Sequence, residues 1–327
     1  MTAAHEIAGF LREAGWDGAD IEPLPGDASF RRYFRIRKDG STAMLMDAPP
    51  PEDPGPFLDA AAWLSAHGHR APAILAERRG RGLVLLEDFG VHPMRDWVDE
   101  HPEAERETYA RAIDALVALH RSPPGPFAPY DMETYQRETA LFTEWWCPAA
   151  GIEVDEGAYA AAWDDALAPL IPRQRPGVTV LRDYHAENIM LMKPVVKGGG
   201  EQGLIDFQDA LVGHPAYDLV SLLQDARRDV APDLERAMLD HYMSQADVAE
   251  EFLADYARLG AQRNAKIVGI FARLWKRDGK PRYLAMIPRV WEAMERDLAH
   301  PALAPVARWF DANIPAEIRA RSGGSIE

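Results

Sequence analysis

The sequence has almost no cysteine and no long apolar stretch, and each absence excludes a class of protein. Cys147 is the single cysteine among 327 residues, so neither an intramolecular disulfide nor a cysteine-rich metal site can form. No stretch of about 20 apolar residues could span a membrane. The opening residues carry charges at helical spacing and lack the apolar core of a signal peptide. We therefore expect a protein of a bacterial-type cytoplasm with no membrane partner.

Basic residues are scarce relative to acidic ones. The chain has 36 Lys and Arg against 52 Asp and Glu, a formal charge of −16, and no basic segment offsets this excess. Such a chain should repel nucleic acid, which we do not expect as a partner, and no obligate protein partner is evident. A Walker A sequence is also absent, which excludes a P-loop ATPase. What the chain does have is a hydrophobic fraction of 47%, over a length that suffices for two domains or lobes.

The first 90 residues alternate between helical and strand-like patterns. An amphipathic helix comes first, and Gly68 ends a second helix over residues 56–68. Strand-like segments occupy residues 31–37 and 42–48, joined by a turn at Asp39-Gly40, and residues 71–80 and 82–90. The order helix, hairpin, helix, hairpin predicts a small lobe over residues 1–90.

The pattern from residue 91 to residue 327 is mainly helical and predicts a second, larger lobe. Helices are predicted over residues 105–121, 131–146, 156–170, 216–229 and most of 232–311. The strand-like segments VTVL, NIMLM and GLIDF predict a small β element within this lobe. Gly198, Gly200 and Gly203 match G-x-G-x-x-G, but a strand-like segment follows them, so a hairpin loop is the better interpretation. The final residues, RSGGSIE, are expected to fray.

Polar residues cluster in LRDYHAENIM, residues 181–190. Asp183 is followed five residues later by Asn188, and Asp206 comes next in GLIDFQDA. Phosphoryl transfer needs a carboxylate that orients and deprotonates the attacking hydroxyl, and oxygen ligands that hold Mg²⁺ against the triphosphate of ATP. Asp183 fits the base, and Asn188 and Asp206 fit the metal ligands. The alternative is that these side chains only cap turns, but three positions in the kinase order favour catalysis.

These segments resemble the aminoglycoside phosphotransferase and choline kinase-like family, whose usual motifs are H-G-D-x-H-x-x-N, I-D-[FW] and D-L-[AV]. The resemblance covers nearly the whole chain and implies an α+β, protein-kinase-like bilobal fold. A small N-terminal lobe with an antiparallel sheet would bind ATP, and a larger, mainly helical C-terminal lobe would carry catalysis. LVLLEDFG is similar to the hinge strand that carries adenine, which implies ATP contacts at Glu87, Asp88 and Phe89. His185 and Asp218 would support the site.

Longer segments are similar to one group within the family, the anomeric kinases for N-acetylmuramate and N-acetylglucosamine used in bacterial cell-wall recycling. These segments include GDASFRRYFRI, LMDAPPPEDPGPF and QRNAKIVGIFARLWKRDGKPRYL. The reaction implied is transfer of a phosphoryl group from ATP to the sugar, which gives sugar 1-phosphate and ADP.

Two positions depart from the family pattern. Leu181-Arg182 replaces His-Gly before the base, and Arg182 could either lie beside the transferred phosphate or substrate or form a structural ion pair. The usual third-strand lysine is absent from TAMLMDAP, which has Met44 and Met46. The backbone and side chains of GDASFRR, or a nearby cation, must then hold the phosphates. The expected ATP contacts there are Ser29, Phe30, Arg31 and Arg32, with Arg35 as a further candidate cation.

The sugar side of the site is less defined by the sequence. Trp145 and Trp146 could stack on a pyranose ring, although adjacent tryptophans on a helix are more often part of a core. Three arginines are candidates for binding the lactyl carboxylate of N-acetylmuramate: Arg227, Arg228 and Arg263. Two other functions remain open, an aminoglycoside- or choline-type kinase of the same fold and a pseudokinase that binds nucleotide without turnover.

Overall fold

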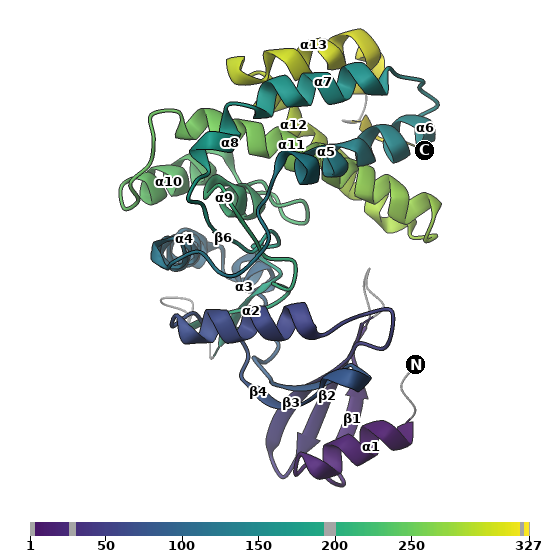
Figure 1. Cartoon of the computed structure of the whole chain (residues 1–327), viewed down its shortest axis with the longest axis vertical. Helices are drawn as coiled ribbons and strands as arrows, with labels where there is room; N and C mark the ends of the chain where they lie inside the picture. The colour runs from purple at the N-terminus through teal and green to yellow at the C-terminus, as the bar shows by residue number, and fades with distance from the viewer. Residues whose placement is uncertain (1–3, 26–30, 193–200, 321–323, 327) are drawn as a thin grey trace. The chain divides into compact units, whose positions relative to one another are not determined.

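The chain folds into two compact units, each built from two segments of sequence. The structure is a computed structural model that describes residues 4–25, 31–192, 201–320 and 324–326. Residues 1–108 and 187–209 form one unit, here called the sheet unit, and residues 109–186 and 210–327 form the helical unit. An antiparallel sheet in the first unit and a mainly helical second unit (Figure 1) confirm the expected α+β class. The assignment of lobes to residues 1–90 and 91–327 stays a prediction.

The sheet unit contains a five-stranded antiparallel sheet in the order β1-β2-β3-β5-β4. The strands are β1 (Asp20–Pro23), β2 (Arg32–Lys38), β3 (Ser41–Asp47), β4 (Ile74–Arg78) and β5 (Leu83–Glu87). Asp39 and Gly40 close the β2–β3 hairpin with φ angles of 50° and 78°. A two-residue turn with both φ angles positive matches the right-handed twist of the flanking strands, so the predicted turn is confirmed.

One face of this sheet forms a core with α1 (Ala4–Glu13), which lies against the strands in Figure 1. Ile7, Phe10 and Leu11 repeat at helical spacing and pack against the sheet. Their partners on the strands are Ile36, Ala43, Leu45, Leu83 and Leu85. Because side chains alternate across a strand, Tyr33 and Arg35 on β2 lie on the opposite face.

The sheet unit also contains helices α2 (Gly55–Ala66) and α3 (Met94–Glu100), 3-10 turns at Arg79–Arg81 and Pro102–Ala104, and a small hairpin of β7 (Ile189–Met192) and β8 (Glu201–Leu204). Backbone bonds attach this hairpin to the rest of the unit, because Leu191 N–H donates to His92 C=O and Leu204 N–H donates to Arg70 C=O, both at 2.8 Å. The prediction that VTVL, NIMLM and GLIDF form one β element in the helical lobe is therefore wrong. NIMLM and GLIDF contribute the β7–β8 hairpin of the sheet unit, whereas VTVL contributes a strand that pairs within the helical unit.

The helical unit surrounds α11 (Phe252–Lys276), a 25-residue helix that contacts α5, α9 and α12. α4 (Glu105–Arg121) spans the boundary between the units, and α7 lies beside α13 (Figure 1). The other elements are α5 (Met132–Leu141), a π-helical turn Phe142–Trp146, α6 (Cys147–Ala149), α7 (Glu156–Leu167), α8 (Leu170–Arg173), β6 (Val178–Val180), β9 (Leu211–Gly213), α9 (Ala216–Leu223), α10 (Pro232–Met243), α12 (Ile287–Leu298), α13 (Ala304–Asn313) and α14 (Ala316–Ala320), with 3-10 turns at Pro281–Met286 and Pro301–Leu303. β6 pairs with β9.

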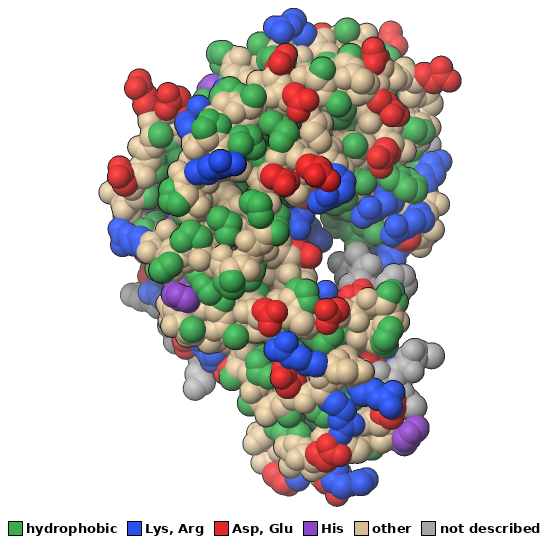
Figure 2. Space-filling view, viewed as in Figure 1, with side chains coloured by type: hydrophobic (Ala, Val, Ile, Leu, Met, Phe, Trp, Pro, Cys, Tyr) green, Lys and Arg blue, Asp and Glu red, His purple; other side chains and the backbone are tan. Residues whose placement is uncertain are grey.

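Surface features are consistent with the composition. Acidic and basic side chains are interspersed on the face shown in Figure 2, without one broad basic area. Among the described residues, no helix combines the length and apolar character needed to cross a membrane.

Candidate active site

The segment that carries the candidate base belongs to the helical unit and follows β6. Asp218 on α9 is fully buried, and its carboxylate accepts the backbone N–H groups of Leu181 at 2.7 Å and Arg182 at 2.8 Å. Burial raises the pKa of Asp218 to about 7, although the two N–H groups oppose the increase. Ser221, one helical turn further along α9, donates its hydroxyl to Arg182 C=O at 3.1 Å. The contacts of Asp218 fit the predicted supporting role, which itself stays a prediction.

Arg182 has the left-handed backbone conformation that usually favours glycine, with φ of 70°. Its guanidinium forms an ion pair with Glu138 on α5 and lies 5.7 Å from the centre of the Tyr130 ring. Burial would lower the pKa of Arg182, but the charge of Glu138 more than offsets this and raises it. The sequence left two roles open for this side chain, a contact with the transferred phosphate or substrate and a structural ion pair. Its contacts with Glu138 and Tyr130 are those of a structural ion pair.

Glu138 is the centre of a buried polar cluster that the motifs did not indicate. Its carboxylate accepts bonds from Tyr130 Oη, Arg182 Nη2, Gln262 Nε2 at 3.2 Å and Lys266 Nζ at 3.0 Å. Burial would raise the pKa of Glu138, but the cations Lys266 and Arg182 lower it, so the group is ionised. Four donors around one carboxylate fix the relative positions of α5, α11 and the segment before Asp183.

Asp183 is half-buried and is surrounded by basic side chains of the helical unit. Burial would raise the pKa of Asp183, but neighbouring His185, Lys266 and Arg263 together lower it. Because burial lowers the pKa of His185 to about 4, that ring is neutral near pH 7. The long basic side chains then remain as the cations that keep Asp183 ionised, which a base or hydrogen-bond acceptor requires.

Arg263 on α11 is buried, with 4% of its surface exposed, so it is not a solvated arginine on a helix surface. Nη2 donates to Ser221 Oγ at 2.9 Å. Nη1 is also buried, and no hydrogen-bond partner for it exists among the described residues. A buried guanidinium nitrogen without a partner is costly unless water or a ligand binds it. Substrate binding by Arg263 is a prediction that this geometry allows.

Arg227 and Arg228 follow α9 and have different environments. Arg227 Nη1 donates to His185 Nε2 at 3.1 Å, and its backbone N–H donates to Asp225 at 2.8 Å. Asp225 also accepts the N–H of Ala186 at 3.2 Å, so it joins the same segment. Arg228 Nη1 donates to the hydroxyl of Tyr109 at 3.2 Å. Arg227 thus contacts the catalytic segment through His185, whereas Arg228 interacts with α4.

The two tryptophans differ in exposure. Trp146 is fully buried, its ring centre lies 4.8 Å from those of Phe142 and Trp291, and Nε1 donates to Gly324 C=O at 2.9 Å. A ring without an exposed face cannot stack on a sugar in this conformation, so the position of Trp146 supports a core role. Trp145 is half-buried in the same π-helical turn. Its sugar contact stays a prediction.

The candidate metal ligands lie together in the sheet unit, beyond the boundary at Ala186–Glu187. Asn188 Nδ2 donates to Asp206 Oδ2 at 3.3 Å, and Gln208 Nε2 donates to Asp206 Oδ1 at 2.8 Å. Asp206 has a left-handed φ of 61°, which ends the predicted GLIDF strand early, at Leu204. One carboxylate and one amide oxygen suit Mg²⁺, which keeps waters and binds substrate phosphates. No group of three or more His, Cys, Asp or Glu in the described residues could hold a metal alone.

The expected ATP contacts also fall in the sheet unit. Ser29 and Phe30 lie outside the described residues. Arg31 pairs with Glu52 at 3.0 Å, and Arg32 pairs with Asp47.

The segment after β5 contains the expected hinge residues. Glu87 accepts Arg70 Nη1 at 2.8 Å, and Asp88 accepts Arg35 Nε at 2.8 Å. Phe89 packs so closely on Gly203 that a Cβ there would lie 2.5 Å from its ring. These contacts anchor the segment, and its adenine contacts stay predictions.

Two solved small-molecule kinases have a similar fold. The choline kinase LicA from Streptococcus pneumoniae aligns with a TM-score of 0.62 at 12% identity, over 92% of this chain and 99% of that one. The aminoglycoside phosphotransferase APH(2'')-Ib, solved with ADP bound, gives 0.61 at 13% identity, over 89% and 97%. At such identities the likeness concerns the fold alone, which is the kinase-like fold expected.

Sequence comparison then assigns the family. The model of the phosphotransferase enzyme family matches residues 20–261. This chain belongs to that family. The N-acetylmuramate/N-acetylglucosamine kinase of Caulobacter vibrioides is 37% identical over 95% of this chain and 97% of its own length. The protein of the same name from Pseudomonas aeruginosa is 38% identical over 88% and 86%. The family resemblance stated from the motifs is thereby confirmed.

Proposed function

We propose that this chain is an ATP-dependent kinase that phosphorylates the anomeric hydroxyl of N-acetylmuramate, N-acetylglucosamine or both. The observation that carries the proposal is the match to kinases named for these two sugars, at 37% and 38% identity over 95% and 88% of the chain. The products would be sugar 1-phosphate and ADP. Cell-wall recycling in the cytoplasm is the setting that we propose for this reaction.

The chemistry of the helical unit supports this function. An ionised Asp183 can accept the hydrogen bond of a sugar hydroxyl and take its proton as the oxygen attacks the terminal phosphate of ATP. Burial would raise the pKa of Asp183, but nearby Lys266 and Arg263 lower it, so the carboxylate stays in the hydrogen-bond-accepting form near pH 7. Asp218 and Ser221 hold the backbone before it.

The sheet unit would supply the metal ligands. Asn188 and Asp206, whose Nδ2 and Oδ2 atoms lie 3.3 Å apart, would hold Mg²⁺ together with phosphate oxygens of ATP. Such a metal supplies charge neutralisation between the phosphates. The two residues flank the β7–β8 hairpin, and the bond from Ile205 N–H to Asn188 C=O at 3.1 Å keeps their backbones close together.

The test is turnover across a panel of acceptors with ATP and Mg²⁺. The panel contains N-acetylmuramate, N-acetylglucosamine, glucosamine, kanamycin and choline, with ADP release and ³¹P NMR of the product as readouts. We expect turnover with the N-acetylated sugars alone and a sugar 1-phosphate product. Turnover with amines alone would refute the proposed substrate, and ATP binding without turnover of any acceptor would favour a pseudokinase.

A further inference from the structure

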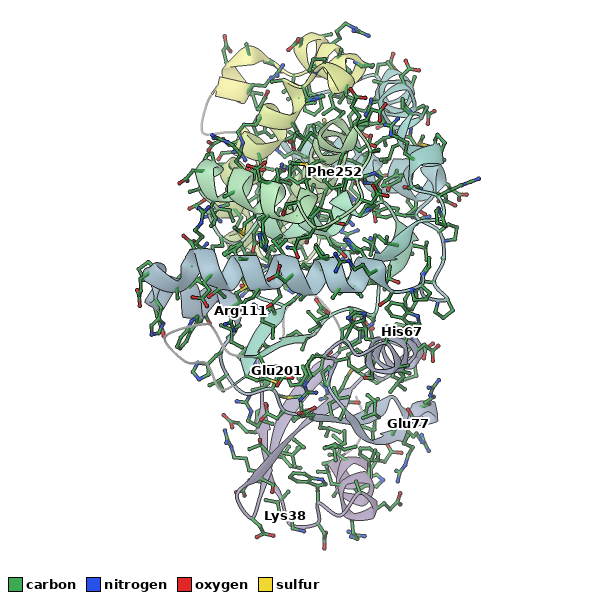
Figure 3. All side chains as sticks on the ribbon, turned by 90° about the vertical axis from the view of Figure 1, so that its left-hand side faces the viewer. Lys38, His67, Glu77, Arg111, Glu201 and Phe252 are labelled. Atoms are coloured by element: carbon green, nitrogen blue, oxygen red, sulfur yellow. The ribbon has the colours of Figure 1, made fainter. Side chains whose placement is uncertain are left out.

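The sheet unit lacks the lysine that kinases place on the third strand to contact the phosphates. Lys38 is the only lysine before residue 193. It lies next to the turn of the β2–β3 hairpin, away from Glu201 of β8 (Figure 3). Its Nζ donates to Gly15 C=O at 3.0 Å. Lys38 therefore does not replace the missing lysine, and an arginine of β2 or of the residue before it must be considered.

Arg32 lies on the wrong face of the sheet. It pairs across the strands with Asp47, in the same row of side chains as Phe34 with Leu45 and Ile36 with Ala43. That row belongs to the core against α1. Arg32 also forms an ion pair with Asp47, and its guanidinium lies 5.6 Å from the Phe34 ring.

Arg35 lies on the opposite face but already holds two groups. Its Nε and Nη2 donate to the two carboxylate oxygens of Asp88 at 2.8 and 3.2 Å, and Nη2 also donates to Gly90 C=O at 2.8 Å. The side chain is buried. These contacts tie β2 to the segment after β5, so Arg35 has a structural role there.

Arg31 remains, and it has the surroundings that a phosphate-binding cation needs. Its side chain lies within hydrogen-bonding reach of Tyr33, and Nε donates to Glu52 Oε2 at 3.0 Å, with 14% and 19% of the Arg31 and Glu52 side chains exposed. Glu52 lies three residues before α2. Protein kinases pair the third-strand lysine with a glutamate on the following helix. Arg31 and Glu52 are a cation and a glutamate in a similar arrangement, with the arginine beside the sheet and the glutamate just before the following helix.

Tyr33 connects this pair with the candidate metal ligand. Its hydroxyl donates to Met46 Sδ at 3.5 Å, which places it beside the β3 methionines. Burial raises the pKa of Tyr33 to about 12, with further increases from the charges of Asp206 and Glu52, whereas Arg31 lowers it. The charges of Arg31, Glu52 and Asp206, all within the sheet unit, therefore act on the same hydroxyl.

We propose that Arg31, oriented by Glu52, replaces the third-strand lysine and binds the phosphates of ATP. The inference rests on the proposed function for its nucleotide but not for its sugar. Arginine suits the task because its charge is permanent and its planar fork binds phosphate through two parallel hydrogen bonds. The ion pair with Glu52 would fix the fork without neutralising the site, because Asp206 with a bound Mg²⁺ would carry a net positive charge.

The experiment measures binding of ATP, ADP and adenosine to the full chain by calorimetry, with Mg²⁺ and without sugar. Arg31→Met should raise the Kd of ATP and ADP by about 10- to 100-fold and leave that of adenosine unchanged. Glu52→Gln should raise the Kd of ATP by a smaller factor, and Arg31→Lys should retain part of the affinity. Arg37→Met is the matched control, because Arg37 lies on β2, the strand that follows Arg31, but pairs with the exposed Glu22 and should not affect binding.

Two results would overturn the inference. Unchanged ATP affinity in Arg31→Met would remove the phosphate contact, and an equal loss for adenosine and ATP would show a structural role. If the unmodified chain bound no ATP, the inference and the proposed function would fail together. Arg31-dependent ATP binding without turnover of any sugar would refute the proposed function and support the inference.

Discussion

Glu138→Gln should destabilise the helical unit strongly, although it replaces a single oxygen by an NH₂ group. The carboxylate accepts four donors, and two of them are the cations Arg182 and Lys266. The amide of glutamine has no charge, and its NH₂ group would face donors instead of accepting from them. The substitution therefore leaves two partly buried cations without their counterion.

The magnitude follows from the burial of these partners. Removing one member of a buried ion pair costs about 3–5 kcal/mol. The side chains of Arg182 and Lys266 retain 19% and 14% exposure, so we expect the lower end, about 3 kcal/mol. For a unit of about 200 residues, each kcal/mol lowers Tm by about 2–4 °C, which gives a decrease of about 6–12 °C.

The assay is urea unfolding of the full chain followed by far-UV circular dichroism, with scanning calorimetry for Tm. Glu144→Gln is the matched control, because Glu144 is exposed just after α5 and the same substitution there should change the free energy of unfolding by less than about 0.5 kcal/mol. A loss for Glu138→Gln as small as that of the control would refute the reasoning.

A double-mutant cycle tests whether the loss comes from Arg182. Arg182→Gly removes the cation and places glycine at φ of 70°, where it is unstrained, and Glu138 keeps its bond with Lys266. In the double variant Arg182 is absent, so only Lys266 lacks its counterion, and we expect a coupling of about 1–3 kcal/mol between the two substitutions. Additive losses would mean that Glu138 acts independently of the segment before Asp183.

Three further predictions concern the site itself. Asp183→Asn should lower turnover by about 10²- to 10⁴-fold, measured by ADP release, with ATP affinity in calorimetry largely unchanged; full turnover would refute the assignment of the base. The pKa of Asp218 is raised by burial from 3.8 to about 7, so the folded chain holds more protons between these values and the free energy of unfolding should fall as pH rises from about 4 to about 7. Urea titrations across this range should show that fall in the unmodified chain, and its persistence in Asp218→Asn would contradict the assignment. Replacing Arg227 or Arg263 by methionine should raise the KM of N-acetylmuramate more than that of N-acetylglucosamine, and equal increases would exclude a carboxylate contact.

The sequence predicted the elements whose patterns are local and periodic. α1, the β2–β3 hairpin and the helix ended by Gly68 follow from apolar spacing and turn residues, and all are present. Short elements were missed, among them β1, α3 and β9. β1 is an exposed edge strand with the sequence DIEP, which has no apolar alternation and contains a proline. α3 has seven residues and β9 has three, which is too short for a periodic signal.

The predictions of a helix end and of strand pairing were wrong where contacts between residues far apart in the sequence determine the structure. The predicted helix over residues 216–229 ends at Leu223, because Asp225 leaves the helix to accept the N–H groups of Ala186 and Arg227. The strands VTVL and NIMLM share an apolar pattern but lie in different units, each with its own partner strand. A pattern of apolar residues shows that a strand is buried without showing what covers it.

The same distinction applies to the candidate site, because its catalytic residues form a local motif whereas some residues that support them lie far away in the sequence. The spacing of Asp183, Asn188 and Asp206 indicated phosphoryl transfer because the reaction requires those groups in that order. Ser221 could also have been found, since it lies three residues after Asp218 on one helix face.

Glu138 could not have been found in this way, because 44 residues separate it from Arg182 and no local motif contains it. The departure from the family pattern at Arg182 was nevertheless the useful signal. A bulky residue at a position that favours glycine has a left-handed backbone, which persists only if its surroundings hold it. In this chain those surroundings are the carboxylates of Glu138 and Asp218, the first on the side chain and the second on the backbone. In this chain the left-handed arginine before the candidate base and the buried glutamate are therefore parts of one structural feature.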